Sequence, residues 1–172
     1  MHELKYNGNK EIGFIMGSAL GKMILSFYKL DDIDFIIPIP LHKKREFQRG
    51  YNQAEIIANG VSSVIKVPVL NDSVWRIVNN KSQTNRNRSA RNLNTDNIFE
   101  VSNFVNLKGK HILLLDDVIT TGATMLSCGQ SLIEKDVKIS VVALAVANWW
   151  LSFLRKDRLK IPCKHHEVVL LR

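Results

Sequence analysis

The sequence predicts an α/β fold with a central, mostly parallel sheet flanked by helices. Helical and strand-like patterns alternate along the chain, as they do in folds with parallel sheets. Two apolar runs also end directly in polar loops, at Pro38 and at Asp116, and open α/β sheets bind ligands at such strand ends. With 172 residues and 45% apolar composition, residues 1–172 suit a single domain with a hydrophobic core.

The first predicted element is a helix over Glu11–Tyr28. This window is the most hydrophobic long stretch of the chain, but Lys22 and Lys29 interrupt it. Because a membrane span needs about 20 largely uncharged residues, we expect a buried amphipathic helix and no membrane span. The N-terminus also lacks the pattern of a signal peptide. Glycines recur at every fourth position, which allows close helix packing: Gly13, Gly17 and Gly21.

Strands and helices alternate over the rest of the chain. A strand over Asp34–Pro38 is followed by a helix over Tyr51–Ile65, which has one apolar face. A strand over Lys110–Leu115 leads, through a polar loop, to a helix near Ala123–Lys135. Lys138–Ala147 is predicted to be a long central strand. Four shorter strands are predicted: Val67–Leu70, Ser73–Val78, Ile98–Val101 and Glu167–Leu171.

Charge and cysteine usage narrow the class of protein. The chain has 24 basic and 16 acidic residues, and its net charge of +8 predicts attraction to phosphates. Charge alone does not separate a small phosphorylated substrate from nucleic acid. The two cysteines, Cys128 and Cys163, have no spacing typical of a disulfide framework or zinc ribbon, so we expect a reducing, cytoplasmic location. Cys163 with His165 and His166 is too compact to close one tetrahedral metal site.

The most informative segment follows the strand at Lys110–Leu115. The strand ends in Asp116 and Asp117, which we call the acid pair. The next residues, the Thr/Gly loop, offer hydroxyls and backbone amides to an anion: Thr120, Thr121, Gly122, Ala123 and Thr124. A carboxylate pair beside such a loop suits a ligand with phosphate, sugar hydroxyls and Mg²⁺. The alternative is a helix junction that Asp and Thr merely cap.

A second candidate region follows the strand that ends at Pro38. This basic loop combines a stiff proline turn with donors and positive charge, as a diphosphate requires: Pro40, Leu41, His42, Lys43 and Arg45. His42 is the histidine expected to touch phosphate, whereas His2 and His111 are expected at the surface or at a strand edge. The alternative is an ordinary solvated charge run.

Two strings carry a family resemblance. D-D-x-x-T-T-G-x-T from Asp116 resembles the phosphoribosyl-diphosphate motif of the type I phosphoribosyltransferases. P-I-P-L-H-K-K-R from Pro38, followed by R-G-Y-N-Q-A, resembles the ComF family, a competence-associated branch of those proteins. L-K-Y-N-G from Leu4 and Q-T from Gln83 also resemble segments of the ComF family. The whole resemblance covers roughly Leu4 to Ala147. The cysteine-rich zinc module of many ComF proteins has no counterpart, which predicts a domain-only version.

The resemblance implies a type I phosphoribosyltransferase fold with a small hood. It also implies phosphoribosyl diphosphate as ligand, with Asp116 and Asp117 on the ribose hydroxyls and on Mg²⁺, and with the Thr/Gly loop on the 5′-phosphate. Residues 79–97 resemble a mobile loop that brings cations such as Lys81 and Arg86 to the leaving diphosphate. An unstructured connector is the alternative. The implied reaction transfers ribose 5-phosphate to a nitrogen acceptor that the sequence does not identify.

A second hypothesis keeps this ligand site without catalysis. The ComF resemblance implies a phosphoribosyl-ligand sensor or an accessory factor in DNA uptake, with single-stranded DNA or DNA-processing proteins as partners. Phe47, Tyr51 and the pair Trp149-Trp150 are candidate stacking platforms for bases. Members of the family often pair, so a homodimer is also expected. Residues 148–172 form a C-terminal extension whose role the sequence does not define.

Overall fold

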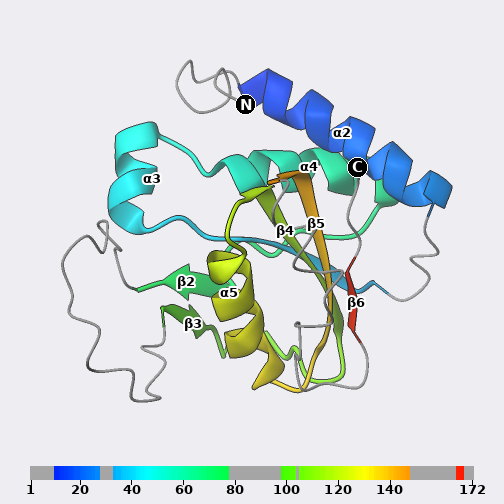
Figure 1. Cartoon of the computed structure of the whole chain (residues 1–172). Coiled ribbons are helices and arrows are strands. Elements are labelled where there is room, and N and C mark those ends of the chain that lie inside the picture. Colours follow the sequence, from blue (N-terminus) through cyan, green and yellow to red (C-terminus); the bar gives the residue numbers. More distant parts are fainter. Residues whose placement is uncertain (1–9, 28–32, 78–97, 104, 148–165, 169–172) are drawn as a thin grey trace.

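A four-stranded parallel sheet forms the centre of the molecule, with strand order β1-β4-β5-β6 (Figure 1). This computed structural model describes residues 10–27, 33–77, 98–103, 105–147 and 166–168. The strands are β1 (Phe35–Pro38), β4 (His111–Ile119), β5 (Lys138–Val146) and β6 (His166–Val168). The parallel sheet with helices on both faces confirms the predicted fold class.

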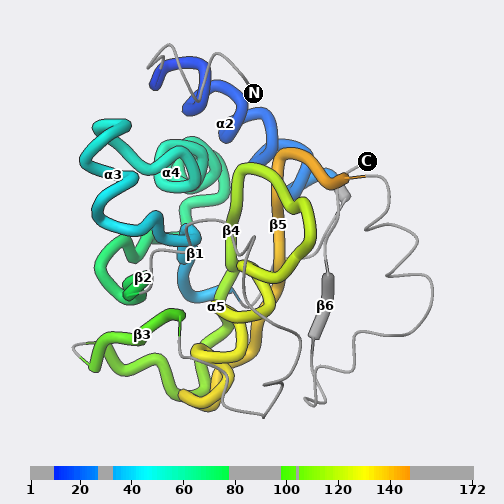
Figure 2. Tube along the Cα trace, turned by 60° about the vertical axis from the view of Figure 1, so that its left-hand side comes forward, coloured from blue at the N-terminus to red at the C-terminus, as the bar shows by residue number. Residues whose placement is uncertain are grey.

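Helices cover both faces of the sheet. On one face, α4 (Gln53–Ile65) packs on β1 and β4, and α2 (Lys10–Phe27) lies across α4 (Figures 1 and 2). On the other face, α5 (Ala123–Ile133) buries Met125, Cys128 and Leu132 against the sheet. None of the described helices is long and apolar enough to cross a membrane. Burial on both faces explains why β4 begins with five consecutive buried residues.

The predicted close packing of the glycine-bearing helix is confirmed. A Cβ atom placed on Gly17 of α2 would collide with the carbonyl group of Ile57 in α4. In the opposite direction, a Cβ atom on Gly60 would collide with the carbonyl oxygen of Phe14. Ser18 Oγ donates a hydrogen bond to Gly60 O at 3.3 Å in the same contact. The two helix backbones therefore touch directly.

A small antiparallel pair lies beside α5. It consists of β2 (Val74–Arg76) and β3 (Phe99–Val101), with Arg76 opposite Phe99. Phe99 is 2% exposed and joins the core on the α5 side of the sheet. An isolated bridge between Arg76 and His42 places the C-terminal end of β2 beside the start of α3 (Lys43–Arg49).

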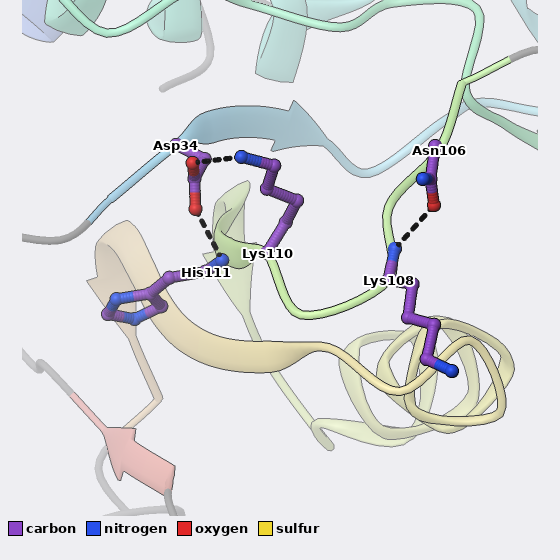
Figure 3. Close-up of polar contacts among 5 residues, drawn as sticks. All are labelled: Asp34, Asn106, Lys108, Lys110 and His111. Carbon is purple, nitrogen blue, oxygen red and sulfur yellow. Dashed lines mark hydrogen bonds and ion pairs between the residues drawn. The ribbon is translucent and has the colours of Figure 1, made fainter.

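An ion pair lies at the opposite end of the sheet, where β4 begins. Asp34 accepts hydrogen bonds from Lys110 Nζ and from His111 N–H, both at 2.9 Å (Figure 3). His111 is 9% exposed, and its Nε2 lies 2.8 Å from Ser140 Oγ. The prediction of a surface or strand-edge position for His111 is wrong because β5 covers its ring.

Several predicted boundaries differ from the structure. The strand predicted to end at Leu115 continues to Ile119, because β4 goes on pairing with β5 through Val118↔Ala145 and Ile119↔Val146. The basic segment is not wholly a loop, since Lys43–Arg49 forms α3. Of the predicted strand Val67–Leu70, only a bridge between Val69 and Ile36 forms; Pro68, in the middle, has no N–H to donate. The last strand begins at His166.

Candidate functional site

The carboxyl end of β1 lies beside the part of β4 where its fully buried run ends and the acid pair begins. Pro38 pairs with Leu115, and the N–H of Ile39 donates to the carbonyl oxygen of Leu115 at 2.8 Å. The basic loop follows Ile39 directly, and the acid pair follows Leu115 directly. Two candidate regions that are far apart in the sequence therefore start side by side, on the carboxyl-end side of the sheet, where open α/β sheets bind their ligands.

Backbone donors orient both members of the acid pair. The N–H of Asp117 donates to Asp116 Oδ1 at 2.8 Å, and the N–H of Val118 donates to Asp117 Oδ1 at 2.7 Å. Both residues are partly buried and lie within β4, just before its last two residues. Each carboxylate is thus held by the residue that follows it, so the pair is preorganised for a ligand at this edge.

The Thr/Gly loop turns sharply from β4 into α5. Gly122 has φ 71° and forms the N-cap position of α5, a left-handed conformation that glycine adopts without steric cost. Thr120 and Thr121 are exposed, and Thr121 Oγ1 accepts the N–H of Ala123 at 3.3 Å. The first N–H groups of a helix lack intrahelical acceptors. This loop therefore combines hydroxyls with helix N-terminal donors, which suits an anion.

The basic loop leads into the short helix α3. His42 caps that helix, because its Nδ1 accepts the N–H of Lys44 at 3.2 Å. Gly50 ends the helix with φ 82°, and its N–H donates to Glu46 O at 2.7 Å. The side chains of Lys43 and Arg45 are exposed. The cations of this region are therefore displayed on a helix rather than on an irregular loop.

Asn52 fixes the start of the basic loop. Its Nδ2 donates to the carbonyl oxygen of Ile39 at 3.0 Å, and its Oδ1 accepts the N–H of Ala54 at 3.1 Å as the N-cap of α4. Asn52 is 7% exposed, so these bonds are shielded from water. An asparagine just before a helix signals a cap, but nothing in the sequence indicates its bond to Ile39.

Arg76 is a further cation at the site that the sequence reasoning missed. Its Cζ lies 5.6 Å from the ring centroid of Phe99, and its Nε is buried without a hydrogen-bond partner among the described residues. Burial lowers the pKa of Arg76; the positive charge of Arg45 lowers it further, and the carboxylate of Asp116 opposes both. The guanidinium charge of Arg76 therefore interacts with charges of both the basic loop and the acid pair.

Cys128 lies on the α5 side of the same strand end. It is fully buried, and burial raises the pKa of its thiol well above the usual range, an effect that the negative charge of Asp116 increases. A thiol of this kind stays protonated and unreactive. Cys128 is therefore a core residue, and the groups of the site that are available to a ligand are carboxylates, cations and backbone donors.

The remaining candidates fall into two groups. Lys81 and Arg86, with residues 79–97, lie outside the described part of the chain, as do Trp149 and Trp150. Tyr51 is 8% exposed, and Lys10 Nζ lies 5.4 Å from its ring centroid, so its ring does not form an open platform.

Within the described ranges, no group of three or more His, Cys, Asp or Glu residues could hold a metal by itself. Two carboxylates fit Mg²⁺, which is commonly held by one or two carboxylates together with water and substrate oxygens.

Comparison with protein families identifies the architecture. The family model of the phosphoribosyl transferase domain matches residues 51–158, a stretch that includes the acid pair and the Thr/Gly loop. The chain belongs to this family. The fold agrees with solved members. Adenine phosphoribosyltransferase from Saccharomyces cerevisiae superposes with a TM-score of 0.54 at 14% identity, over 91% of this chain and 76% of that chain. At this identity the likeness concerns the fold alone.

Curated relatives assign the chain to the ComF branch. Competence protein ComFC of Bacillus subtilis is 31% identical over 141 residues, which are 82% of this chain and 55% of that protein. Competence protein F of Haemophilus influenzae is 36% identical over 91 residues, 52% of this chain and 40% of that protein. DNA utilization protein YhgH of Escherichia coli is 26% identical over 154 residues, 88% of this chain and 64% of that protein. The chain thus spans roughly half of these relatives.

Proposed function

We propose that this phosphoribosyltransferase-type protein binds phosphoribosyl diphosphate with Mg²⁺ and transfers ribose 5-phosphate to a nitrogen acceptor. The observation that carries the proposal is the hydrogen bond between Ile39 N–H and Leu115 O, 2.8 Å long. It joins the end of β1, which bears the basic loop, to the residue of β4 that directly precedes the acid pair. A ligand with a diphosphate and a sugar phosphate on one ribose needs these two groups of residues together.

Each part of the site has a role in this proposal. Asp116 and Asp117 bind the ribose hydroxyls and help to hold Mg²⁺, which supplies charge neutralisation for the diphosphate when bound. The Thr/Gly loop binds the 5′-phosphate through its hydroxyls and the first N–H groups of α5. The basic loop and Arg76 bind the diphosphate, and Lys81 and Arg86 approach it from residues 79–97.

The transfer exchanges one bond at the anomeric carbon for another. The bond from C1′ to the diphosphate oxygen breaks, and its electron pair leaves with the diphosphate. The lone pair of the acceptor nitrogen forms the new C1′–N bond, and that nitrogen gives up its proton. Positive charge develops on the sugar and negative charge on the leaving group; in this proposal Asp116 stabilises the first charge and Arg76 the second.

The relatives' names support a second candidate, a non-catalytic function. They describe competence and DNA utilization, and the described residues around the site do not identify an acceptor. A protein of this kind binds the phosphoribosyl ligand as a sensor and acts with single-stranded DNA or DNA-processing proteins. Homodimer formation and a cytoplasmic location remain predictions in both cases.

Calorimetric titration with phosphoribosyl diphosphate, with and without Mg²⁺, tests the shared part of both candidates. We expect saturable, Mg-dependent binding that is lost in the Asp116→Asn, Asp117→Asn double variant. Asp136→Asn is the matched control, because it removes an exposed carboxylate beyond α5 at a left-handed position (φ 60°) that asparagine tolerates. Unchanged binding by the double variant would exclude the acid pair. Release of diphosphate during an acceptor screen then separates the enzyme from the sensor.

A further inference from the structure

Helix α2 lies across the outer side of α4, and one face of α2 is open to solvent (Figure 1). Six large apolar side chains are exposed in the described part of the chain. Two of them, Phe47 and Ile77, lie elsewhere, and the other four lie on α2: Phe14 (43% exposed), Ile15 (58%), Met23 (39%) and Leu25 (56%). A group of exposed apolar side chains marks an interaction surface, because leaving such a group in water is unfavourable.

Two opposite charges lie on the same face as Ile15. Glu11, Ile15 and Lys22 are all exposed, and their spacings of four and seven residues align them along one side of the helix. The small residues Ser18 and Ala19 lie between Ile15 and Lys22. The face therefore has a negative charge at the start of α2, a positive charge toward its C-terminal end, and a large apolar side chain with small residues in between.

We propose that this outer face of α2 binds the same face of a second copy of the chain, with the two helices antiparallel. Two-fold contacts are self-complementary, because each copy offers the same patch. With the two-fold axis at the midpoint between Glu11 and Lys22, Glu11 of each copy faces Lys22 of the other copy. The same register places Ile15 of each copy against Ser18 and Ala19 of the other, so that large side chains enter the gaps above small ones.

Two other arrangements fit this face less well. Parallel helices would bring Glu11 against Glu11 and Lys22 against Lys22, and like charges oppose that contact. A helix on a membrane surface carries lysine and arginine on the face opposite its apolar side chains. In α2 that opposite face is packed on α4, where Gly17 meets the carbonyl group of Ile57. The antiparallel pair of copies uses both the apolar side chains and the charges.

Sedimentation velocity of the full chain over a series of concentrations tests the proposal. We expect a reversible dimer. Ile15→Ser should raise its dissociation constant about a hundredfold, because each dimer loses two apolar side chains from the contact. Ile77→Ser is the matched control, since Ile77 is 52% exposed and directly follows β2, outside the proposed contact.

Charge reversal tests the antiparallel register. Glu11→Lys and Lys22→Glu should each weaken the dimer about tenfold, because each change places like charges together twice in one dimer. The variant with both changes should dimerise like the wild type. An equimolar mixture of the two single variants should form a heterodimer, since every charged contact then joins opposite charges. A heterodimer in the mixture without recovery in the variant with both changes would show parallel helices and overturn the proposed register.

Several results would overturn the proposal as a whole. These are a monomer at the highest soluble concentration, a dimer that Ile15→Ser leaves intact, or equal weakening by Ile77→Ser. A monomer that binds anionic phospholipid vesicles, and loses them in Ile15→Ser, would assign the face to a membrane surface instead. Binding of phosphoribosyl diphosphate by Ile15→Ser should stay at the wild-type level, since Ile15 lies outside the candidate site. The result therefore does not depend on the proposed transferase function.

Discussion

The side-chain amide of Asn52 donates a hydrogen bond to the carbonyl oxygen of Ile39 over 3.0 Å. The same Ile39 donates its N–H to Leu115 O, immediately before the acid pair. Asn52 also caps α4 through Ala54. One buried side chain thus couples the end of β1, the basic loop and the helix that packs on the sheet.

Replacement of Asn52 by serine separates these two tasks. Serine is a good N-cap and keeps the bond to Ala54, but it is too short to reach Ile39. A buried carbonyl left without its donor costs about 1–3 kcal/mol, so we expect the free energy of unfolding to fall by that amount. Asn52→Ala should lose about 1 kcal/mol more because the cap is also lost. Urea denaturation measures both differences.

The ligand affinity of the same variant tests the positional role of Asn52. A basic loop released from α4 should bind phosphoribosyl diphosphate about tenfold more weakly, because misplaced binding groups lose much of their effect. Asn71→Ser is the control: Asn71 donates to Glu55 Oε1 at 2.9 Å on the exposed side of α4. If Asn52→Ser lowers stability and leaves the affinity intact, Asn52 is a structural cap only.

Arg76→Met should weaken ligand binding without lowering stability. Methionine keeps an apolar stem next to Phe99 but removes a partly buried charge that Arg45 repels. We expect about tenfold weaker binding of phosphoribosyl diphosphate, the worth of one charge-assisted hydrogen bond, and an unchanged or higher melting temperature. Lys135→Met, which removes an exposed cation beyond the C-terminal end of α5, is the charge control. A lower melting temperature with normal binding would make Arg76 a structural residue.

The sequence predicted those parts of the molecule that are determined by local residue patterns. The apolar runs and the acid pair predicted the parallel sheet and its ligand-bearing edge because each signal lies within a few consecutive residues. The predicted end of β4 was wrong. Val118 and Ile119 still pair with β5, although the two aspartates before them suggest that the strand breaks there. Helix α3 was missed because its cap, His42, is an unusual one.

The long-range part of the site could not be predicted in the same way. Arg76 and Asp116 lie far apart along the chain, and a bridge between Arg76 and His42 brings Arg76 beside the basic loop. No periodicity or motif in either segment encodes this pairing. The bond from Asn52 to Ile39 likewise depends on how α4 docks on the sheet. Such relationships follow from tertiary packing, which single-sequence patterns do not contain.

Gly17→Ala and Gly60→Ala should each destabilise the contact between α2 and α4. A methyl group at either position meets backbone atoms of the opposite helix, and backbone cannot rotate away. Overpacking of this kind costs about 1–3 kcal/mol, despite the helix propensity gained from alanine. Gly129→Ala is the control in α5, where the nearest atoms to a new Cβ, on Leu114 and Ile139, lie 3.9 and 4.0 Å away. Thermal unfolding should show a neutral or stabilised Gly129→Ala; stable Gly17→Ala and Gly60→Ala variants would contradict the close approach.

The ion pair at the start of β4 should make stability depend on pH in the acid range. The hydrogen bond from Lys110, and after it the backbone N–H of His111, hold the pKa of Asp34 below its ordinary value of 3.8. Because the folded-state pKa is lower than the unfolded one, the stabilisation is fully present above the unfolded pKa. It is lost as the pH falls through the folded pKa.

Asp34→Asn should therefore be less stable than the wild type at pH 7, and the difference should shrink below about pH 4. The side chains are 31% and 42% exposed, so salt should also reduce the difference at neutral pH. Urea denaturation between pH 7 and pH 3 at two salt concentrations measures both effects, with Asp72→Asn as an exposed control. A difference that stays constant down to pH 3 would show that the hydrogen bond to His111, rather than the charge of Asp34, stabilises this edge of the sheet.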